Sequence, residues 1–264
     1  MKKIYIVLFL PLLLFSKVHY AKLEPYDSVT IKSAVSGLVM KVDLDAEGRM
    51  IVSKRVVHID DKMDKIALRD AKESKVFLEE MLKINKTIAT GLQKSFQRKQ
   101  GYYQRVSKLS STSKTQKDNA YSAFVAAKTQ YLSTQEKIIS LKKQILDTKN
   151  RIVQLQDTIA KKSIVLKDRY LYRLMVREGD YVVPGSPLAK IEDLSRAKLV
   201  LFLDADEIEN IEQKAVYLDD KKTAYHIDKV WKSTDEKFVS SYRSEIYLPA
   251  PKERFSRLMK VEIK

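Results

Sequence analysis

The sequence of 264 residues contains no cysteine, so disulfide bridges, thiolate metal sites and cysteine nucleophiles are excluded. A lipid-modified amino-terminal cysteine is excluded for the same reason. No glycine-rich phosphate loop and no nucleophile elbow occurs, so any energy coupling has to come from a partner. Proline is absent between Pro25 and Pro184, which leaves a long middle stretch with nothing that forces a break in a helix.

Histidines and carboxylates give no catalytic or metal pattern either. The histidines stand far apart in the sequence, at His19, His58 and His226. Four carboxylates do cluster, at Asp204, Asp206, Glu207 and Glu209. They open a short predicted helix, Ala205 to Gln213, where acidic side chains favour the helix dipole. The sequence therefore predicts a protein that is not an enzyme and that holds no cofactor and no metal.

The middle stretch, Lys62 to Lys162, has the apolar repeat of an antiparallel helical hairpin. Its second half carries an apolar residue at every seventh position, which is the spacing of a coiled-coil seam: Phe124, Tyr131, Ile138, Ile145, Ile152 and Ile159. The first half is expected to supply the facing row in two sets with a slip in register between them: Phe77, Met81, Ile84, Ile88, Leu92 and Phe96, then Tyr103, Val106 and Leu109. The polar run 110–113 reverses the chain, because hydroxyl side chains compete for backbone hydrogen bonds.

The amino terminus has the pattern of a secretory signal. Lys2 and Lys3 precede an apolar run from Ile4 to Phe15, which is short for a membrane span and typical of a signal peptide. We expect cleavage near Ala21. His19 is unfavourable three residues before that bond, so an uncleaved anchor is the alternative. Either outcome predicts a protein that works outside the cytoplasm.

Short strand patterns flank the hairpin. Before it, Gly37-x-Val39-x-x-Val42 interrupts one alternating pattern and begins another. After it comes a longer pattern with two turns: Leu174-x-Val176-x-x-Gly179-Asp180-x-Val182-x-x-Gly185-x-x-Leu188. From Lys198 to the end the composition changes to that of a small all-β unit.

These two half-motifs resemble the split lipoyl-type domain of periplasmic adaptor proteins, also called membrane fusion proteins of the HlyD type. The resemblance implies an elongated α+β fold, in which a long antiparallel coiled-coil hairpin is inserted in a split lipoyl-like (barrel-sandwich hybrid) β domain and a small β-barrel domain follows. The implied divisions are a signal peptide (1–21), the first lipoyl-like half (22–61), the hairpin (62–162), the second lipoyl-like half (163–194) and the β-barrel domain (195–264). Lys62 stands where a lipoyl domain carries its modified lysine, but the hairpin replaces that loop, and capping by Asp60 or Asp61 is the better account.

The resemblance also implies a function. It predicts a periplasmic adaptor that links an inner-membrane transporter, of the resistance-nodulation-division (RND) or ABC class, to a TolC-type outer-membrane channel. Self-association into a ring of six subunits is implied as well. The alternative is a structural coiled-coil protein of the cell envelope without a transport role. Nucleic acid is not expected as a partner, because export and the absence of a reading motif both argue against it.

Charge singles out the far end of the hairpin as a docking site. Lys62 to Lys162 contains 22 Lys and Arg against 9 Asp and Glu, and Lys83 to Lys117 holds nine basic residues and no acidic one. Such one-signed clustering favours an acidic partner over general solubility or contact with anionic lipid or peptidoglycan. Arg105-x-x-x-Leu109 resembles the tip motif with which adaptors engage TolC-type channels, although Gln116 stands where that motif has Ser or Thr. The expected site is Arg105, Leu109 and Gln116 with a steering rim of Lys108, Lys114 and Lys117; otherwise Arg105 is ordinary surface charge and Leu109 the last seam residue.

Overall fold

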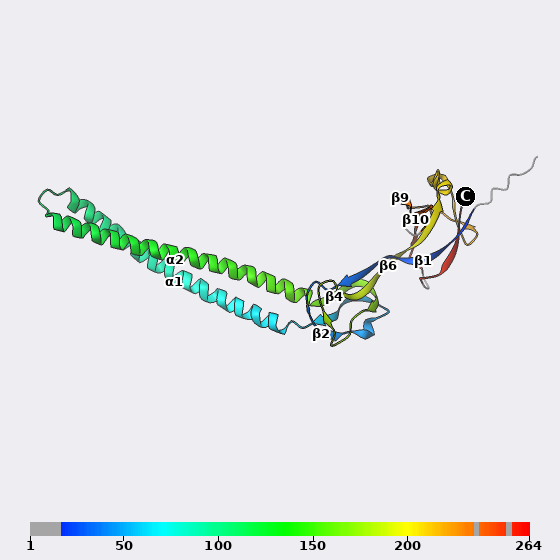
Figure 1. The fold of residues 1–264 in the computed structure, drawn as a ribbon, viewed down its shortest axis with the longest axis horizontal. Helices are drawn as coiled ribbons and strands as arrows, with labels where there is room; N and C mark the ends of the chain where they lie inside the picture. Colours follow the sequence, from blue (N-terminus) through cyan, green and yellow to red (C-terminus); the bar gives the residue numbers. More distant parts are fainter. Residues whose placement is uncertain (1–16, 235–237, 252–254) are drawn as a thin grey trace, which may run out of the picture.

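A computed structural model describes residues 17–234, 238–251 and 255–264. The molecule is elongated, with a helical hairpin at one end and strands at the other (Figure 1). Residues 1–16, which make up most of the expected signal peptide, lie outside the described part. Within the described part, no helix has both the length and the apolar composition needed to span a bilayer.

The hairpin consists of α1 (Lys62–Lys108) and α2 (Lys114–Lys161), with 47 and 48 residues. At roughly 1.5 Å per residue each helix is about 70 Å long. Ile138, Leu141 and Ile145 of α2 are buried, so the seven-residue repeat predicted for this helix is confirmed there.

The row predicted for the first part of α1 is wrong. Phe77, Met81, Ile84 and Ile88 are exposed on the outside of the hairpin. The face turned toward α2 is shifted by one position and follows a continuous repeat of threes and fours. Its buried and half-buried members are Ala71, Lys75, Leu78, Leu82, Asn85, Ala89, Leu92, Phe96, Gln100, Tyr103 and Val106. Because this row is continuous, no slip in register is needed. Its buried alanines, Ala71 and Ala89, are small and let the two helices approach each other.

Aromatic rings join the two helices in the distal half of the hairpin. The ring of Phe96 stacks on Phe124 and Tyr131, with centroid distances of 5.7 and 6.0 Å. Tyr103 lies 5.8 Å from Phe124 and 5.3 Å from Tyr121. Such pairs add to the stabilisation that apolar burial gives, so this ladder holds the far end of the hairpin closed.

The first β unit is built from both sides of the hairpin. It contains β2 (Gly37–Val42) and β3 (Arg49–Ile59) from before the hairpin. From after the hairpin come β4 (Ser163–Leu174), β5 (Tyr181–Val182) and the start of β6 (Pro187–Asp204). β3 and β4 pair antiparallel from Arg49↔Leu171 to His58↔Ser163, and residues of both halves share one buried core. The expected insertion of the hairpin into a split β unit is therefore confirmed.

Gly37 is required by this packing. A Cβ atom at Gly37 would lie 2.6 Å from Cγ2 of Ile59, closer than two carbon atoms can approach. The glycine that opens the first half-motif thus lets β2 begin directly against the end of β3.

The second β unit has its own buried core. It contains β7 (Val216–Leu218), β8 (Lys221–Lys222), β9 (Lys229–Thr234), β10 (Ser241–Pro249) and β11 (Leu258–Ile263). The helix expected from Ala205 to Gln213 is shorter: α3 covers Ala205–Ile208, and a separate 3-10 turn covers Ile211–Gln213. Asn210 lies between them with a left-handed φ of 52°, which ends the α-helical path.

Two long strands run through both β units. β1 (Val18–Lys32) pairs antiparallel with β6 from Leu23↔Leu199 to Lys32↔Pro187, with a bulge between Pro25 and Asp27. At this bulge the guanidinium of Arg196 lies 3.9 Å from the ring centroid of Tyr26. β1 thus begins at Val18, within the range 1–21 that the sequence assigns to a signal peptide.

The seam of α2 predicts different effects for two neighbouring residues. Ile145 is 7% exposed and Leu146 is 58% exposed. Ile145→Ala should lower the free energy of unfolding by about 2 kcal/mol, because it leaves a cavity between the helices. Leu146→Ala should change it by less than about 0.5 kcal/mol. Denaturant unfolding followed by far-UV circular dichroism measures both, and equal losses would contradict the register.

Candidate docking site at the hairpin tip

The reversal between α1 and α2 is fixed by a capping box. Leu109 leaves the helix in an extended conformation, with φ −83° and ψ 125°. Ser113 caps α2: its Oγ accepts a hydrogen bond from the Gln116 N–H at 3.2 Å, and Gln116 Oε1 accepts one from the Ser113 N–H at 3.3 Å. Two orphan backbone donors are satisfied in this way, so the tip is a defined turn at the predicted place.

The six expected site residues all lie at this end of the hairpin. Five are exposed and Lys117 is half-buried. Leu109 is 53% exposed, whereas Val106 is only 9% exposed, so Val106 is the last buried residue of the α1 seam. Leu109 instead offers an apolar side chain to solvent. Gln116 has a structural role in the cap, which the sequence comparison with a docking motif did not indicate.

The side chain of Arg105 extends along α1 toward Gly101. Its Nη1 atom is 3.5 Å from the position that a Cβ atom of Gly101 would occupy. Gly101 stands one turn earlier on the same face of the helix, so the missing side chain leaves room for the guanidinium. Within the described residues no carboxylate pairs with Arg105, and its five N–H donors remain available for a planar acceptor such as a carboxylate.

Ion pairs are concentrated at the base of the hairpin. There Lys65 pairs with Asp61 at 2.9 Å, and Lys162 pairs with Asp64. The nine basic side chains from Lys83 to Lys117 have no acidic partner among the residues that the structure describes. Positive charge therefore accumulates over the distal half of the arm without internal neutralisation.

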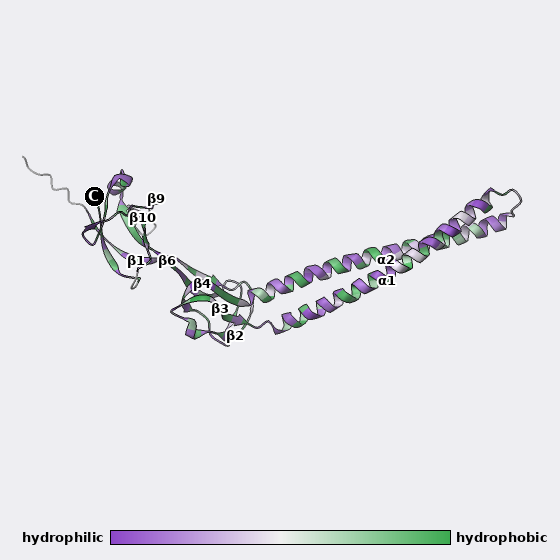
Figure 2. Cartoon of the chain, turned by 180° about the vertical axis from the view of Figure 1, so that it is seen from behind, coloured by the Kyte–Doolittle hydropathy of each residue, from purple (hydrophilic) through white to green (hydrophobic). Residues whose placement is uncertain are grey.

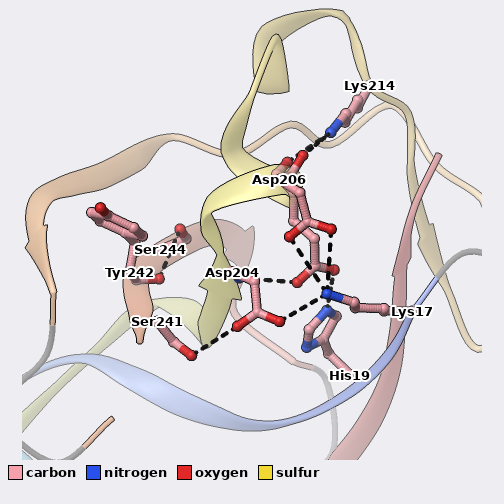
Figure 3. Close-up of polar contacts among 9 residues, drawn as sticks. Lys17, His19, Asp204, Asp206, Lys214, Ser241, Tyr242 and Ser244 are labelled. Carbon is pink, nitrogen blue, oxygen red and sulfur yellow. Dashed lines mark hydrogen bonds and ion pairs between the residues drawn. The ribbon is translucent and has the colours of Figure 1, made fainter. Parts of the chain in front are cut away.

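The carboxylate cluster of the second β unit has polar partners within the chain (Figure 3). Asp204, Asp206 and Glu207 offer oxygen atoms within 4.8 Å of one another. Lys17 Nζ lies 2.8 Å from Asp204 Oδ2, and His19 Nε2 lies 2.7 Å from Glu207 Oε1. Hydrogen bonds from Lys17 and then from Ser241 lower the pKa of Asp204. These contacts join the start of β1 to α3, and Glu209 takes no part in them.

Lys17 and His19 were missed as partners of this cluster because the sequence places them in a signal peptide. The hydrogen bond to Asp204 is the main reason that the pKa of Lys17 is raised. An ammonium group and an imidazole already face the three carboxylates. The cluster thus has a structural role in the second β unit.

A second feature was also missed, namely apolar rows on the outside of both helices. Figure 2 shows hydrophobic and hydrophilic segments alternating along both helices. On α2 an exposed apolar residue recurs at every seventh position: Val125, Leu132, Ile139, Leu146 and Val153. On α1 the exposed row is the one first assigned to the seam, Phe77, Met81, Ile84 and Ile88. The regular spacing was a signal in the sequence, but it lies beside the stronger seam pattern and was hidden by it. Extended exposed apolar surface of this kind often marks an interaction site.

Comparison with known proteins identifies the fold. No family model and no curated protein matches the sequence. The crystal structure of MacA from Actinobacillus actinomycetemcomitans is similar, with a TM-score of 0.75, 16% identity, and coverage of 94% of this chain and 78% of that one. The membrane fusion protein Spr0693 from Streptococcus pneumoniae R6 gives a TM-score of 0.65, 7% identity, and coverage of 93% and 99%. A MacA–MexA chimera with the Pseudomonas aeruginosa MexA α-hairpin gives a TM-score of 0.56 and 19% identity, and the match covers 94% of this chain and 80% of that one.

The chain therefore has the fold of a membrane fusion protein. The expected α+β architecture, with a helical hairpin in a split lipoyl-like unit followed by a smaller β unit, is confirmed. The roles of the six tip residues stay predictions.

The capping box predicts a local effect at the tip. Ser113→Ala should destabilise the first turn of α2 by about 1 kcal/mol, because the N–H of Gln116 loses its acceptor. Hydrogen exchange of the amides in this turn should become faster. Ser111→Ala is the matched control, since it removes a hydroxyl from the same loop outside the cap. Unchanged exchange in Ser113→Ala would show that the cap does not hold the turn.

Proposed function

We propose that this chain is a non-catalytic periplasmic adaptor that links an inner-membrane transporter to a TolC-type outer-membrane channel for efflux or secretion. The observation that carries the proposal is a hairpin about 70 Å long that projects away from both β units (Figure 1). Its far end carries basic side chains that have no acidic partner among the described residues. A bridging protein requires two separated contact regions, and this shape provides them. The fold shared with a membrane fusion protein supports the same function.

The tip is proposed to contact the channel. Leu109 supplies an exposed apolar side chain, and Arg105 can form two parallel hydrogen bonds to one carboxylate. Lys108, Lys114 and Lys117 surround them as a steering rim, which raises the rate of encounter with an acidic surface and loses influence as salt increases. The partner surface is therefore expected to combine acidic groups with a small apolar pocket.

The β units are proposed to contact the transporter, of the RND or ABC class, at the opposite end of the molecule. Copies of the chain are proposed to stand side by side in a ring of six. The outer apolar rows support such self-association, because each helix of the hairpin offers one to a neighbour. A heterologous contact of α1 with α2 of the next copy generates a ring when the rotation between neighbouring copies closes.

Charges of opposite sign flank the outer rows of α1 and α2 at the same level along the hairpin. Ala71 and Ser74 of α1 line one cavity together with Thr148 of α2, so the antiparallel helices bring the exposed row around Phe77 level with the row around Leu146. Glu73 and Glu80 flank the α1 row. The α2 row is flanked by basic residues, Lys142, Lys143 and Lys149. Parallel hairpins in a ring would therefore place acidic side chains of one copy opposite basic side chains of the next.

Arg105→Asp tests the docking site. It should weaken binding to the channel by about tenfold or more, because a charge-assisted hydrogen bond contributes about 1.5–3 kcal/mol and the new carboxylate repels an acidic surface. Leu109→Asp should have a similar effect. Arg98→Asp is the control, since it makes the same charge change about two turns further from the tip.

The measurement is export of the substrate in cells, together with helicity and expression of each variant. Loss of export with normal helicity in Arg105→Asp and Leu109→Asp, but not in Arg98→Asp, is the expected pattern. Normal export in both tip variants would show that the tip is not the docking surface.

A charge exchange tests the ring contact. Glu80→Lys and Lys143→Glu should each reduce self-association at high protein concentration, because each places like charges opposite one another. The double variant should restore it. Analytical ultracentrifugation measures the assembly state of all three. A double variant that associates as poorly as the single variants would exclude this pairing of faces.

A further inference from the structure

The first residues of β1 belong to the folded second β unit, although their sequence resembles the end of a signal peptide. Val18 to Lys22 pair residue by residue with Glu262 to Leu258 of β11. Ala21 is 2% exposed and lies in the core of this unit together with Leu23. A strand segment with this pairing and burial is a structural part of the unit.

The topology gives this segment a connecting role. β1 stands between β6 on one side and β11 on the other, and β11 is followed by β7 and β8. A cut after Ala21 would remove four of the five residue pairs that join β1 to β11 and leave only Lys22↔Leu258. Leu23 would keep its backbone bonds to Arg257 and Ser256. The strands β11, β7 and β8 would then be joined to β1 only through Lys22 and Leu23.

The same cut would leave a charge imbalance. Lys17 and its contacts to Asp204 and Asp206 would be lost (Figure 3). The contact of His19 with Glu207 would be lost as well. Three carboxylates within 4.8 Å would then face one another, and like charges so close together are unfavourable. The part of the chain before Lys22 thus supplies both strand pairing and the polar partners of the three carboxylates.

We infer that Lys17 to Ala21 remain in the exported protein, so the bond after Ala21 is not the processing site. Any bond at which the leader is removed lies at or before Ser16–Lys17, and an uncleaved anchor meets the same requirement. The small side chain of Ala21 fits a signal-peptidase site, but it fits equally a crowded position in the core. This inference rests on the export that the proposed function requires.

Ala21→Asp separates the two roles of this residue in the full-length chain. If Ala21 is buried in the mature protein, an aspartate there places a carboxylate in the core. Processing should then match that of the wild type, while the melting temperature of the purified protein falls. If the bond after Ala21 is cleaved, aspartate next to it blocks processing, and an unprocessed precursor accumulates while the wild type is cut. That result would overturn the inference. Tyr20→Asp is the control, because Tyr20 is exposed and should change neither property.

The intact mass of the wild-type protein, purified from the cell envelope, gives an independent answer. The expected mass belongs to a chain that starts at Lys17 or earlier, and a chain that starts at Lys22 would overturn the inference even if the Ala21→Asp variant fails to accumulate. Cell fractionation keeps the two proposals apart. Protein found only in the cytoplasm contradicts the proposed function. In that case purified Ala21→Asp that melts like the wild type would overturn the placement of Ala21 in the core.

Discussion

The antiparallel pairing of β3 with β4 is the constraint on which the rest of the molecule depends. It joins strands that are separated by the whole hairpin, and it continues to the point where the Ile59 N–H donates to the Lys162 carbonyl at 2.8 Å. The start of α1 and the end of α2 are therefore held side by side. Two helices of nearly equal length that leave from this base must run antiparallel and meet again at the tip. The position of the basic surface thus follows from a backbone ladder at the opposite end of the arm.

The hairpin could be predicted from the sequence because its periodic signals are local, whereas the split β unit was expected from the resemblance of its half-motifs to the lipoyl-type domain of adaptor proteins. The repeat of α2 is regular, and the break at Ser110–Ser113 coincides with the observed turn. The α1 row could not be chosen correctly from periodicity, since α1 carries two apolar rows one position apart. Phe77 and Ile84 are larger and more apolar than Ala71 and Ala89, yet the small residues face α2. The choice depends on how closely the helices approach, which is a tertiary property.

Two features that the sequence analysis assigned to other roles have structural roles in the fold. Gln116 was compared with a docking residue, and its side chain closes the cap of α2. The segment 17–21 was assigned to a leader, and it lies in a strand with Ala21 in a core. Both cases have the same physical origin. A residue type that suits one role, a polar group at a tip or a small residue after an apolar run, also suits a structural role that becomes apparent only through distant partners such as β11 and α3.

In the proposed function one chain bridges two membranes through opposite ends of its long axis. The most direct test is purification of the tagged full-length protein from whole envelopes after mild chemical crosslinking, with identification of the crosslinked partners by mass spectrometry. We expect one inner-membrane transporter and one outer-membrane channel to be recovered together in a single complex. Recovery of the chain only with itself, as a coiled-coil assembly without either membrane protein, would contradict it.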